Sequence, residues 1–155
     1  MKGRRSASGA RIIAAAREWI GTPYHDQASV KGVGADCLGL ARGVWREVIG
    51  REPTGIPPYT RDWGEVGSVE VFAATAGRWM IPVSLSEARP GALLVFRMRE
   101  GAIAKHCGIL SDVGTIIHSY DRLGVIEEPY TDAWRRRLAF VFLYPQRRDV
   151  KRKSS

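Results

Sequence analysis

The chain has 155 residues and a formal net charge of +8, from 24 Lys and Arg against 16 Asp and Glu. This length suits one domain with a hydrophobic core, and no apolar run is long enough to predict a membrane-spanning helix. The basic start is interrupted by Arg11, Arg17 and Glu18, which is not typical of a signal peptide. No zinc-finger, RRM or helix-turn-helix signature indicates a specific nucleic-acid partner.

Three helices are predicted in the first half of the chain, over residues 8–20, 37–49 and 65–80. Ser8 and Asp36 are suited to cap the first two helices, which end near Gly21 and Gly50. Residues 22–35, between the first two helices, are predicted as a loop. The Pro-rich insert 51–63 is predicted to be irregular and to line or cover a cleft.

The second half changes to short apolar runs between turn residues, which is typical of strands. The runs are 91–98, 105–112, 115–121, 124–130 and 139–145, and a helical turn capped by Thr131 or Asp132 is predicted before the last. Helices followed by strands predict an α+β domain over residues 8–145, with N-terminal helices packed on a mostly antiparallel sheet of five to six strands. Residues 1–7 and 146–155 are basic and are predicted to be flexible tails.

Cys37 follows Asp36 at the predicted start of the second helix. The unpaired N–H groups and the dipole at a helix start favour negative charge, and such a position lowers a thiol pKa from about 8.5 toward ~3.5–7.5. These N–H groups could also stabilise an oxyanion. Gly39 is unfavourable inside a helix, and we expect close packing of the helix on the sheet to explain it.

Two histidines lie on either side of a predicted hairpin, "KHCGILSDVGTIIHSY". A three-residue connection, Asp112 to Gly114, sets a register in which His118 opposes Gly108 and His106 opposes Tyr120. The two imidazoles then share one face as diagonal neighbours. One can take the proton of a thiol, and the other can orient the first.

Two alternatives to a nucleophile remain open for Cys37. It can be an inert buried thiol, because free cysteines are among the most buried residues. A zinc site built from Cys37, His106, Cys107 and His118 is disfavoured, because neighbours in a strand point to opposite faces. The same alternation predicts that Cys107 points away from the cleft. We expect no metal and no organic cofactor.

Five short motifs together resemble the NlpC-type cysteine peptidases of bacterial cell walls, which have a compact papain-like fold. They occur in family order between about Ile12 and Tyr144: "GTPY", "ADCLGL", "RPGALLVF", "KHCGIL" and "IIHSY". The chain departs from the family at Leu38, where Ser is frequent, and at Ala92, where Asp is frequent. Neither position carries the chemistry.

The resemblance implies a role for each matching residue. Cys37 is the implied nucleophile, His106 the general base and then acid, and His118 the group that orients His106. Tyr24 of "GTPY" matches a tyrosine whose hydroxyl lies near the nucleophile. Tyr24 and Asp36 are therefore expected at the oxyanion or substrate site, although an aromatic residue packed under a loop is an equal alternative for Tyr24.

The implied activity is hydrolysis of peptidoglycan stem peptides, usually between D-glutamate and the diamino acid. The "DC-x-GL" motif and the long "VKGVGA" segment before it resemble the branch of the family that is carried by phage tails and gene transfer particles. Tail or baseplate proteins are then expected partners, and the enzyme is expected in a particle tail that acts on the periplasm and cell wall. An amidase or acyltransferase of the same fold, or a non-enzymatic tail or assembly subunit, remains an alternative.

Overall fold

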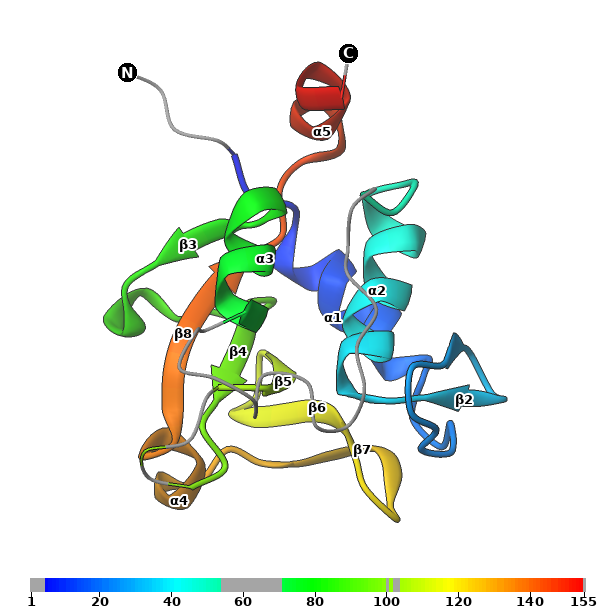
Figure 1. Ribbon diagram of the computed structural model, residues 1–155, viewed down its shortest axis with the longest axis vertical. Helices are drawn as coiled ribbons and strands as arrows, with labels where there is room; N and C mark the ends of the chain where they lie inside the picture. The colour runs from blue at the N-terminus through cyan, green and yellow to red at the C-terminus, as the bar shows by residue number, and fades with distance from the viewer. Residues whose placement is uncertain (1–4, 54–70, 100, 102–103, 155) are drawn as a thin grey trace.

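The computed structural model describes residues 5–53, 71–99, 101 and 104–154 (Figure 1). Most of the Pro-rich insert 51–63 and the predicted helix before Val71 lie outside the described residues. The architecture is α+β, as expected, with helices packed on a six-stranded antiparallel sheet. No helix in the described ranges is both long and apolar enough to cross a membrane.

The two N-terminal helices begin at the predicted caps. They are α1 (Gly9–Arg17) and α2 (Cys37–Val48), and the Ser8 hydroxyl accepts a hydrogen bond from the Arg11 N–H at 3.4 Å. The remaining helical segments are α3 (Val71–Trp79), the 3-10 turn η1 (Leu85–Glu87), α4 (Asp132–Arg135) and α5 (Arg147–Ser154). Thr131, one of the two predicted caps, is the N-cap residue of α4.

The five predicted strands form most of the main sheet, which runs in the order β3-β8-β4-β5-β6-β7. The strands are β3 (Ile81–Val83), β4 (Leu93–Phe96), β5 (His106–Leu110), β6 (Thr115–Tyr120), β7 (Gly124–Pro129) and β8 (Leu138–Leu143). The sequence did not predict β3, because this edge strand has three residues and contains Pro82. It also did not predict the small pair β1 (Ser29–Val30) and β2 (Gly34–Ala35) within the expected loop.

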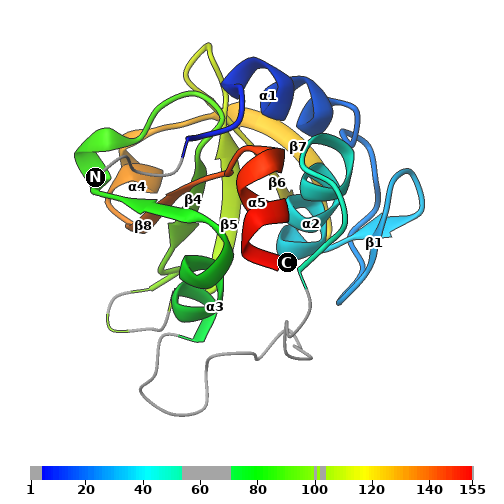
Figure 2. The same cartoon turned by 90° about the horizontal axis from the view of Figure 1, so that it is seen from above.

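The two faces of the sheet bury separate clusters. Helices α1, α2 and α3 pack against the face that carries Leu93, Val95, Cys107 and Ile109. In Figure 2, α2 lies beside β5 and β6, with α1 toward the top and α3 toward the bottom of the view. The opposite face carries Leu94, Phe96 and Ile116, and Tyr130 and Trp134 pack against it. Strand alternation therefore assigns neighbouring residues of β5 to different surroundings.

Two glycines let α2 pack closely on its neighbours. A Cβ on Gly39 would lie 1.8 Å from the Ala28 carbonyl oxygen, and a Cβ on Gly43 would lie 2.0 Å from the Trp19 ring. The expected contact between Gly39 and the sheet is therefore wrong, because this glycine lies against the residue that precedes β1. Both contacts hold the start of α2 in place.

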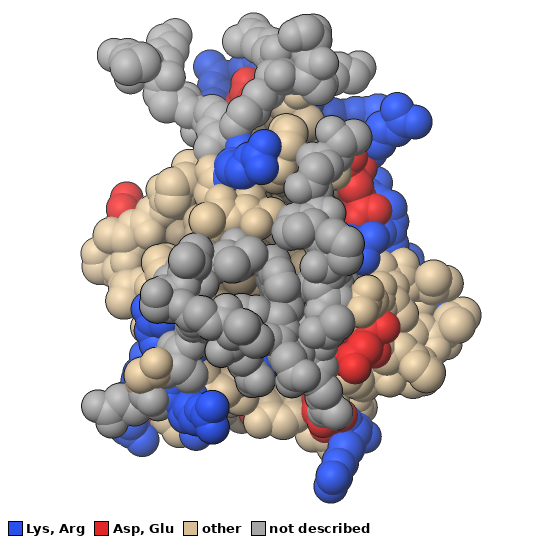
Figure 3. Space-filling model, in the orientation of Figure 1, with Lys and Arg blue, Asp and Glu red and all other residues tan. Residues whose placement is uncertain are grey.

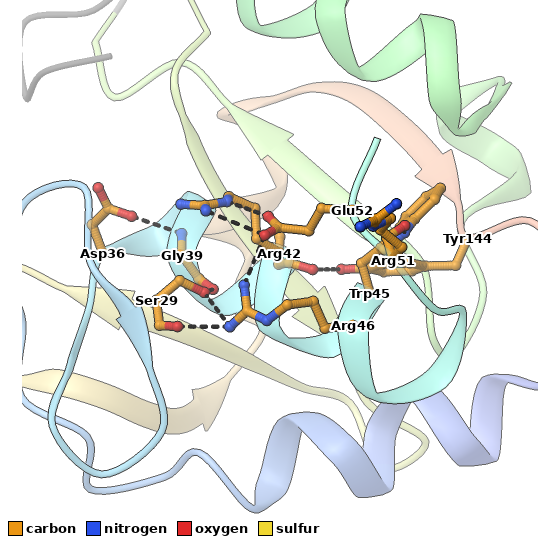
Figure 4. Close-up of polar contacts among 10 residues, drawn as sticks. Ser29, Asp36, Gly39, Arg42, Trp45, Arg46, Arg51, Glu52 and Tyr144 are labelled. Atoms are coloured by element: carbon orange, nitrogen blue, oxygen red, sulfur yellow. Dashed lines mark hydrogen bonds and ion pairs between the residues drawn. The ribbon is translucent and has the colours of Figure 1, made fainter. Parts of the chain in front are cut away.

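Polar side chains tie α2 to the segments on either side of it (Figure 4). Arg46 donates hydrogen bonds to the Ser29 carbonyl at 2.6 Å and to Glu52 at 3.2 Å, and Arg42 also bonds Glu52. The Tyr144 hydroxyl donates to the Ala41 carbonyl at 2.9 Å, which joins α2 to the residue after β8.

The two chain ends lie against each other. The Ala7 N–H donates to the Tyr144 carbonyl at 2.7 Å, and the Gln146 N–H donates to the Arg5 carbonyl at 2.9 Å. Val150 of α5 packs against the main core. The expected flexible tails at 1–7 and 146–155 thus contain paired backbone at residues 5–7 and a helix from Arg147.

Candidate active site

Cys37 is the first residue of α2 and is half-buried. The Asp36 carboxylate caps this helix, because its Oδ1 atom accepts a hydrogen bond from the Gly39 N–H at 2.6 Å. The thiol therefore lies at the positive end of a twelve-residue helix, where negative charge is stabilised. The Cys37 Sγ atom lies 3.7 Å from the Lys105 carbonyl oxygen, beside the start of β5.

The second carboxylate oxygen of Asp36 holds the preceding loop. It accepts a hydrogen bond from the Gln27 N–H at 2.7 Å, and Gln27 has a φ of 62°, in the left-handed region that non-glycine residues seldom adopt. Both oxygens of Asp36 thus bind backbone N–H groups. Asp36 supports the helix start and the loop, and we assign no oxyanion or substrate contact to it.

The two histidines meet as the hairpin register requires. Ile109 pairs with Ile117 and Leu110 with Ile116, which is the predicted register, and Gly114 has the expected positive φ of 76°. The His106 Nε2 and His118 Nδ1 atoms are 2.7 Å apart. The hairpin prediction is confirmed, and Nδ1 is the His106 nitrogen left to face Cys37.

The surroundings of Cys37 favour its thiolate. The hydrogen-bonded thiol of Cys107 and the nearby imidazole of His106 hold the pKa of Cys37 well below its usual value, against the opposing effect of burial. Burial and the negative charge of Cys37 raise the pKa of the Cys107 thiol. The two cysteines are therefore adjacent in space, and the pKa values of their thiols are shifted in opposite directions.

Cys107 lies on the face of β5 opposite to His106, as strand alternation predicted, and this face is the one that packs under the nucleophile helix. The Cys107 Sγ atom donates a hydrogen bond to the Cys37 carbonyl at 3.3 Å, and its side chain is fully buried. Alternation therefore points this thiol toward α2.

The sequence did not single out two further residues of the site, Glu128 and Trp134. The Glu128 Oε2 atom lies 3.0 Å from His118 Nε2, and its Oε1 atom accepts a hydrogen bond from Trp134 Nε1 at 3.0 Å. The β6–β7 register pairs His118 with Ile126, so Glu128 is the diagonal neighbour of His118 on the same face. The register of this second hairpin was the signal in the sequence that could have identified Glu128.

Aromatic rings enclose the two imidazoles. The Trp134 ring stacks on His106 with centroids 5.7 Å apart, and it meets His118 edge-on at 5.1 Å. Tyr120 lies edge-on to both histidines. The His118 side chain has no exposed surface, and burial lowers its pKa from 6.5 to about 4. His118 is therefore neutral at neutral pH.

Burial and the nearby negative charge of Cys37 both raise the pKa of Tyr24. Tyr24 is therefore close enough to the nucleophile to respond to its charge. The Tyr24 hydroxyl donates a hydrogen bond to Asp26 at 3.1 Å. The phenol therefore stays protonated and keeps a proton that can be donated. Reaching an oxyanion would require this hydroxyl to turn away from Asp26.

The side-chain chemistry of the site suits nucleophilic attack more than metal binding. Among the described residues, no group of three or more His, Cys, Asp or Glu side chains is arranged to hold a metal ion. The two histidine nitrogens that face each other are hydrogen-bonded, and the remaining nitrogen of His118 is bonded to Glu128. A thiolate, an imidazole and an orienting partner are the groups that acyl transfer requires.

Comparisons with known proteins agree with this geometry. The NlpC/P60 family matches residues 21–142. The NlpC/P60 domain of the peptidoglycan hydrolase SagA is 26% identical, with a TM-score of 0.59, and the match covers 87% of this chain and 97% of that chain. Comparison with curated protein sequences found no match.

Two further solved structures share the fold at lower identity. An NlpC/P60 family protein from Bacillus cereus is 20% identical with a TM-score of 0.63, and the match covers 91% of this chain and 41% of that chain. A lipoprotein-like NLP/P60 family protein from Staphylococcus aureus is 18% identical with a TM-score of 0.62, and the match covers 94% and 45%. The chain thus spans less than half of these two proteins. The family match and the shared papain-like fold show that the chain belongs to the NlpC/P60 family of cysteine peptidases and peptidoglycan hydrolases.

Proposed function

We propose that this chain is an endopeptidase that hydrolyses peptidoglycan stem peptides, with Cys37 as nucleophile. The observation that carries the proposal is the line of contacts from the Cys37 thiol to His106 and on to His118. The first half of the line supplies a thiolate with a lowered pKa. The second half supplies a base that is held in one orientation.

The reaction follows from these positions as two acyl transfers. The Cys37 thiolate attacks the carbonyl carbon of the scissile bond, and His106 holds the thiol proton. The oxyanion lies at the start of α2, where backbone N–H groups point toward it. The C–N bond then breaks, the amine leaves with the proton from His106, and a thioester remains on Cys37.

Water completes the cycle. His106 takes a proton from a water molecule, which attacks the thioester carbonyl and forms the new carboxylate. Cys37 leaves as the thiolate and shares the recovered proton with His106. His118 keeps His106 in position through both steps, and the aromatic rings around the imidazoles limit access of other water molecules.

The finer assignments belong to the same proposal. We propose cleavage between D-glutamate and the diamino acid, and delivery by a phage-like tail or a gene transfer particle. The form of "GVGADCLGL" supports this delivery, since it resembles the branch found on such particles.

The test of the activity is mass spectrometry of purified peptidoglycan fragments after digestion. We expect the wild-type chain to release a free amino group on the diamino acid, and Cys37→Ala to release none while unfolding at the same temperature. A transferred acyl chain, or a product cut at another amide, would contradict the endopeptidase assignment in favour of a related acyltransferase or amidase. Equal products from both proteins would contradict the nucleophile.

Delivery has a separate test. Proteomics of purified tailed particles should find this chain at low copy, near the tail tip. Its absence from particles that infect normally would contradict delivery and would leave the chemistry unaffected.

A further inference from the structure

We infer that Glu128 is a positioning residue that, together with Trp134, fixes where the protons lie on both active-site histidines. This inference rests on the proposed roles of Cys37 and His106. It adds a carboxylate that is separated from the reacting thiol by the two imidazoles. Its effect on the thiol passes through His118.

The contacts of Glu128 are specific at both oxygens. Oε2 lies 3.0 Å from His118 Nε2, and Oε1 accepts from Trp134 Nε1 at 3.0 Å. The His118 side chain is 0% exposed and the Glu128 side chain is 32% exposed. The carboxylate thus closes the buried histidine from the solvent side, and Trp134 fixes the carboxylate.

The direction of each hydrogen bond follows from what each atom can do. An ionised carboxylate only accepts hydrogen bonds, so His118 must carry its proton on Nε2. The Nδ1 atom of the neutral ring is then an acceptor, and His106 must donate to it from Nε2. Before it takes the thiol proton, His106 carries no proton on Nδ1, and this is the atom that receives the proton of Cys37.

The substitution Glu128→Gln should move the proton of each histidine to its other nitrogen. An amide has one oxygen that accepts and one nitrogen that donates, whereas Trp134 Nε1 can only donate. Trp134 therefore selects the amide oxygen and leaves the amide nitrogen facing His118. His118 then moves its proton to Nδ1, His106 moves its own to Nδ1, and the base that faces Cys37 is blocked.

Removing the Trp134 N–H donor should restore the wild-type arrangement of protons on the two histidines. In the double variant Glu128→Gln, Trp134→Phe, the amide is free to turn and to present its oxygen to His118. The phenylalanine ring keeps most of the packing against the imidazoles. A purely structural role for Glu128 predicts the opposite, because a second substitution in a packed cluster adds to the damage.

Glu127 supplies a matched control from the neighbouring position. It is the residue before Glu128 in β7, so alternation points it to the other face of the sheet. Its carboxylate bonds Arg17 at 3.1 Å and the Thr115 hydroxyl at 2.6 Å. Glu127→Gln removes the same charge from the same strand and should leave the histidine protons unchanged.

The experiment combines NMR of the imidazole nitrogens with steady-state kinetics on the full chain. A wrong histidine tautomer lowers kcat by about 10⁴ where the orienting group touches the base directly. Through one intervening ring, we expect Glu128→Gln to lower kcat by about 10- to 1000-fold with an unchanged KM. The nitrogen spectrum should show the proton of His118 on Nε2 in the wild type and on Nδ1 in this variant.

The double variant should regain both the wild-type tautomer and most of the kcat of Trp134→Phe alone. A His118 proton on Nδ1 in the wild type would overturn the inference, and so would an unchanged spectrum in Glu128→Gln. The spectra need no substrate. A chain with the expected tautomers and no peptidoglycan hydrolysis would therefore contradict the proposed function while supporting the proton arrangement.

Discussion

At the scale of single residues, two thiols lie in contact but differ in pKa because their surroundings differ. Cys37 lies at a helix start beside His106, and its pKa is lowered. Cys107 is fully buried one contact away, and its pKa is raised. The surroundings of each thiol therefore decide the direction in which its pKa is shifted.

We predict that iodoacetamide near neutral pH alkylates Cys37 much faster than Cys107. The reason is that the thiolate is the reactive form and that Cys107 has no exposed surface. Peptide mass spectrometry over a time course gives both rates in one sample. The labelling of Cys107 in Cys37→Ala is the control. Equal rates in the native wild-type chain would contradict the assignment.

The depressed pKa of His118 predicts an acid-sensitive stability. The unfolded chain binds a proton near pH 6.5 and the folded one near pH 4, so stability is complete above about 6.5 and falls as the pH drops toward 4. The depression from 6.5 to about 4 is worth roughly 3 kcal/mol of unfolding free energy.

Urea unfolding at several pH values measures this loss. His118→Asn should flatten the pH dependence between 6.5 and 4. His25→Asn, which replaces an exposed histidine outside the network, is the matched control. Parallel pH curves for the wild type and His118→Asn would show that another group is responsible.

At the scale of elements, two close glycine contacts and an N-cap determine the position of helix α2. Its glycines face the backbone before β1 and the Trp19 ring, which follows α1, and its N-cap binds the loop that precedes it. The nucleophile is therefore placed by packing several residues away. A change in that packing should therefore be detected as a change in the free energy of unfolding.

A pair of helical glycines tests this packing. Gly39→Ala should destabilise the chain by about 1–3 kcal/mol, because its Cβ would overlap the Ala28 carbonyl oxygen. Gly77→Ala in α3 has its nearest neighbour at 3.8 Å and should instead stabilise by about 0.5–1 kcal/mol. Urea midpoints at constant slope give both values. A stabilised Gly39→Ala variant would contradict the close contact.

At the scale of the whole molecule, the chain carries a formal net charge of +8. Figure 3 shows Lys and Arg side chains in separate groups along the edges of one face, not in a single patch. Exposed arginines stand at positions 135–137, at the end of α4 and directly after it. Such a distribution favours weak attraction to an extended polyanion over a defined site.

We predict that binding to purified cell walls weakens with salt. Retention in a sedimentation assay should be high at 50 mM NaCl and largely lost at 500 mM, because screening shortens the reach of exposed charges from about 10 Å at 0.1 M toward about 3 Å at 1 M. Walls stripped of their anionic polymers should retain little protein at either salt concentration. Retention that is independent of salt would contradict an electrostatic attraction.

Local patterns in the sequence predicted the elements that depend on neighbouring residues. Ser8 and Asp36 cap their helices as expected, and Gly114 closes the hairpin that brings His106 and His118 together. Turn and cap chemistry acts over a few residues, so it can be read from the sequence directly. The strand at Ile81 was missed because its pairing with β8 is what makes it a strand.

The sequence by itself determined the α+β order, the capped cysteine and the pair of histidines. Only the tertiary structure decided the surroundings of these groups: the thiol of Cys107 against Cys37, the carboxylate of Glu128 behind His118, and the carbonyl of Ala28 against Gly39. The physical reason is that each of these contacts joins residues from separate elements. The contacts of Cys107 and Ala28 depend on how α2 packs on the rest of the chain, which no local pattern specifies. The contact of Glu128 depends on the registers of two consecutive hairpins taken together.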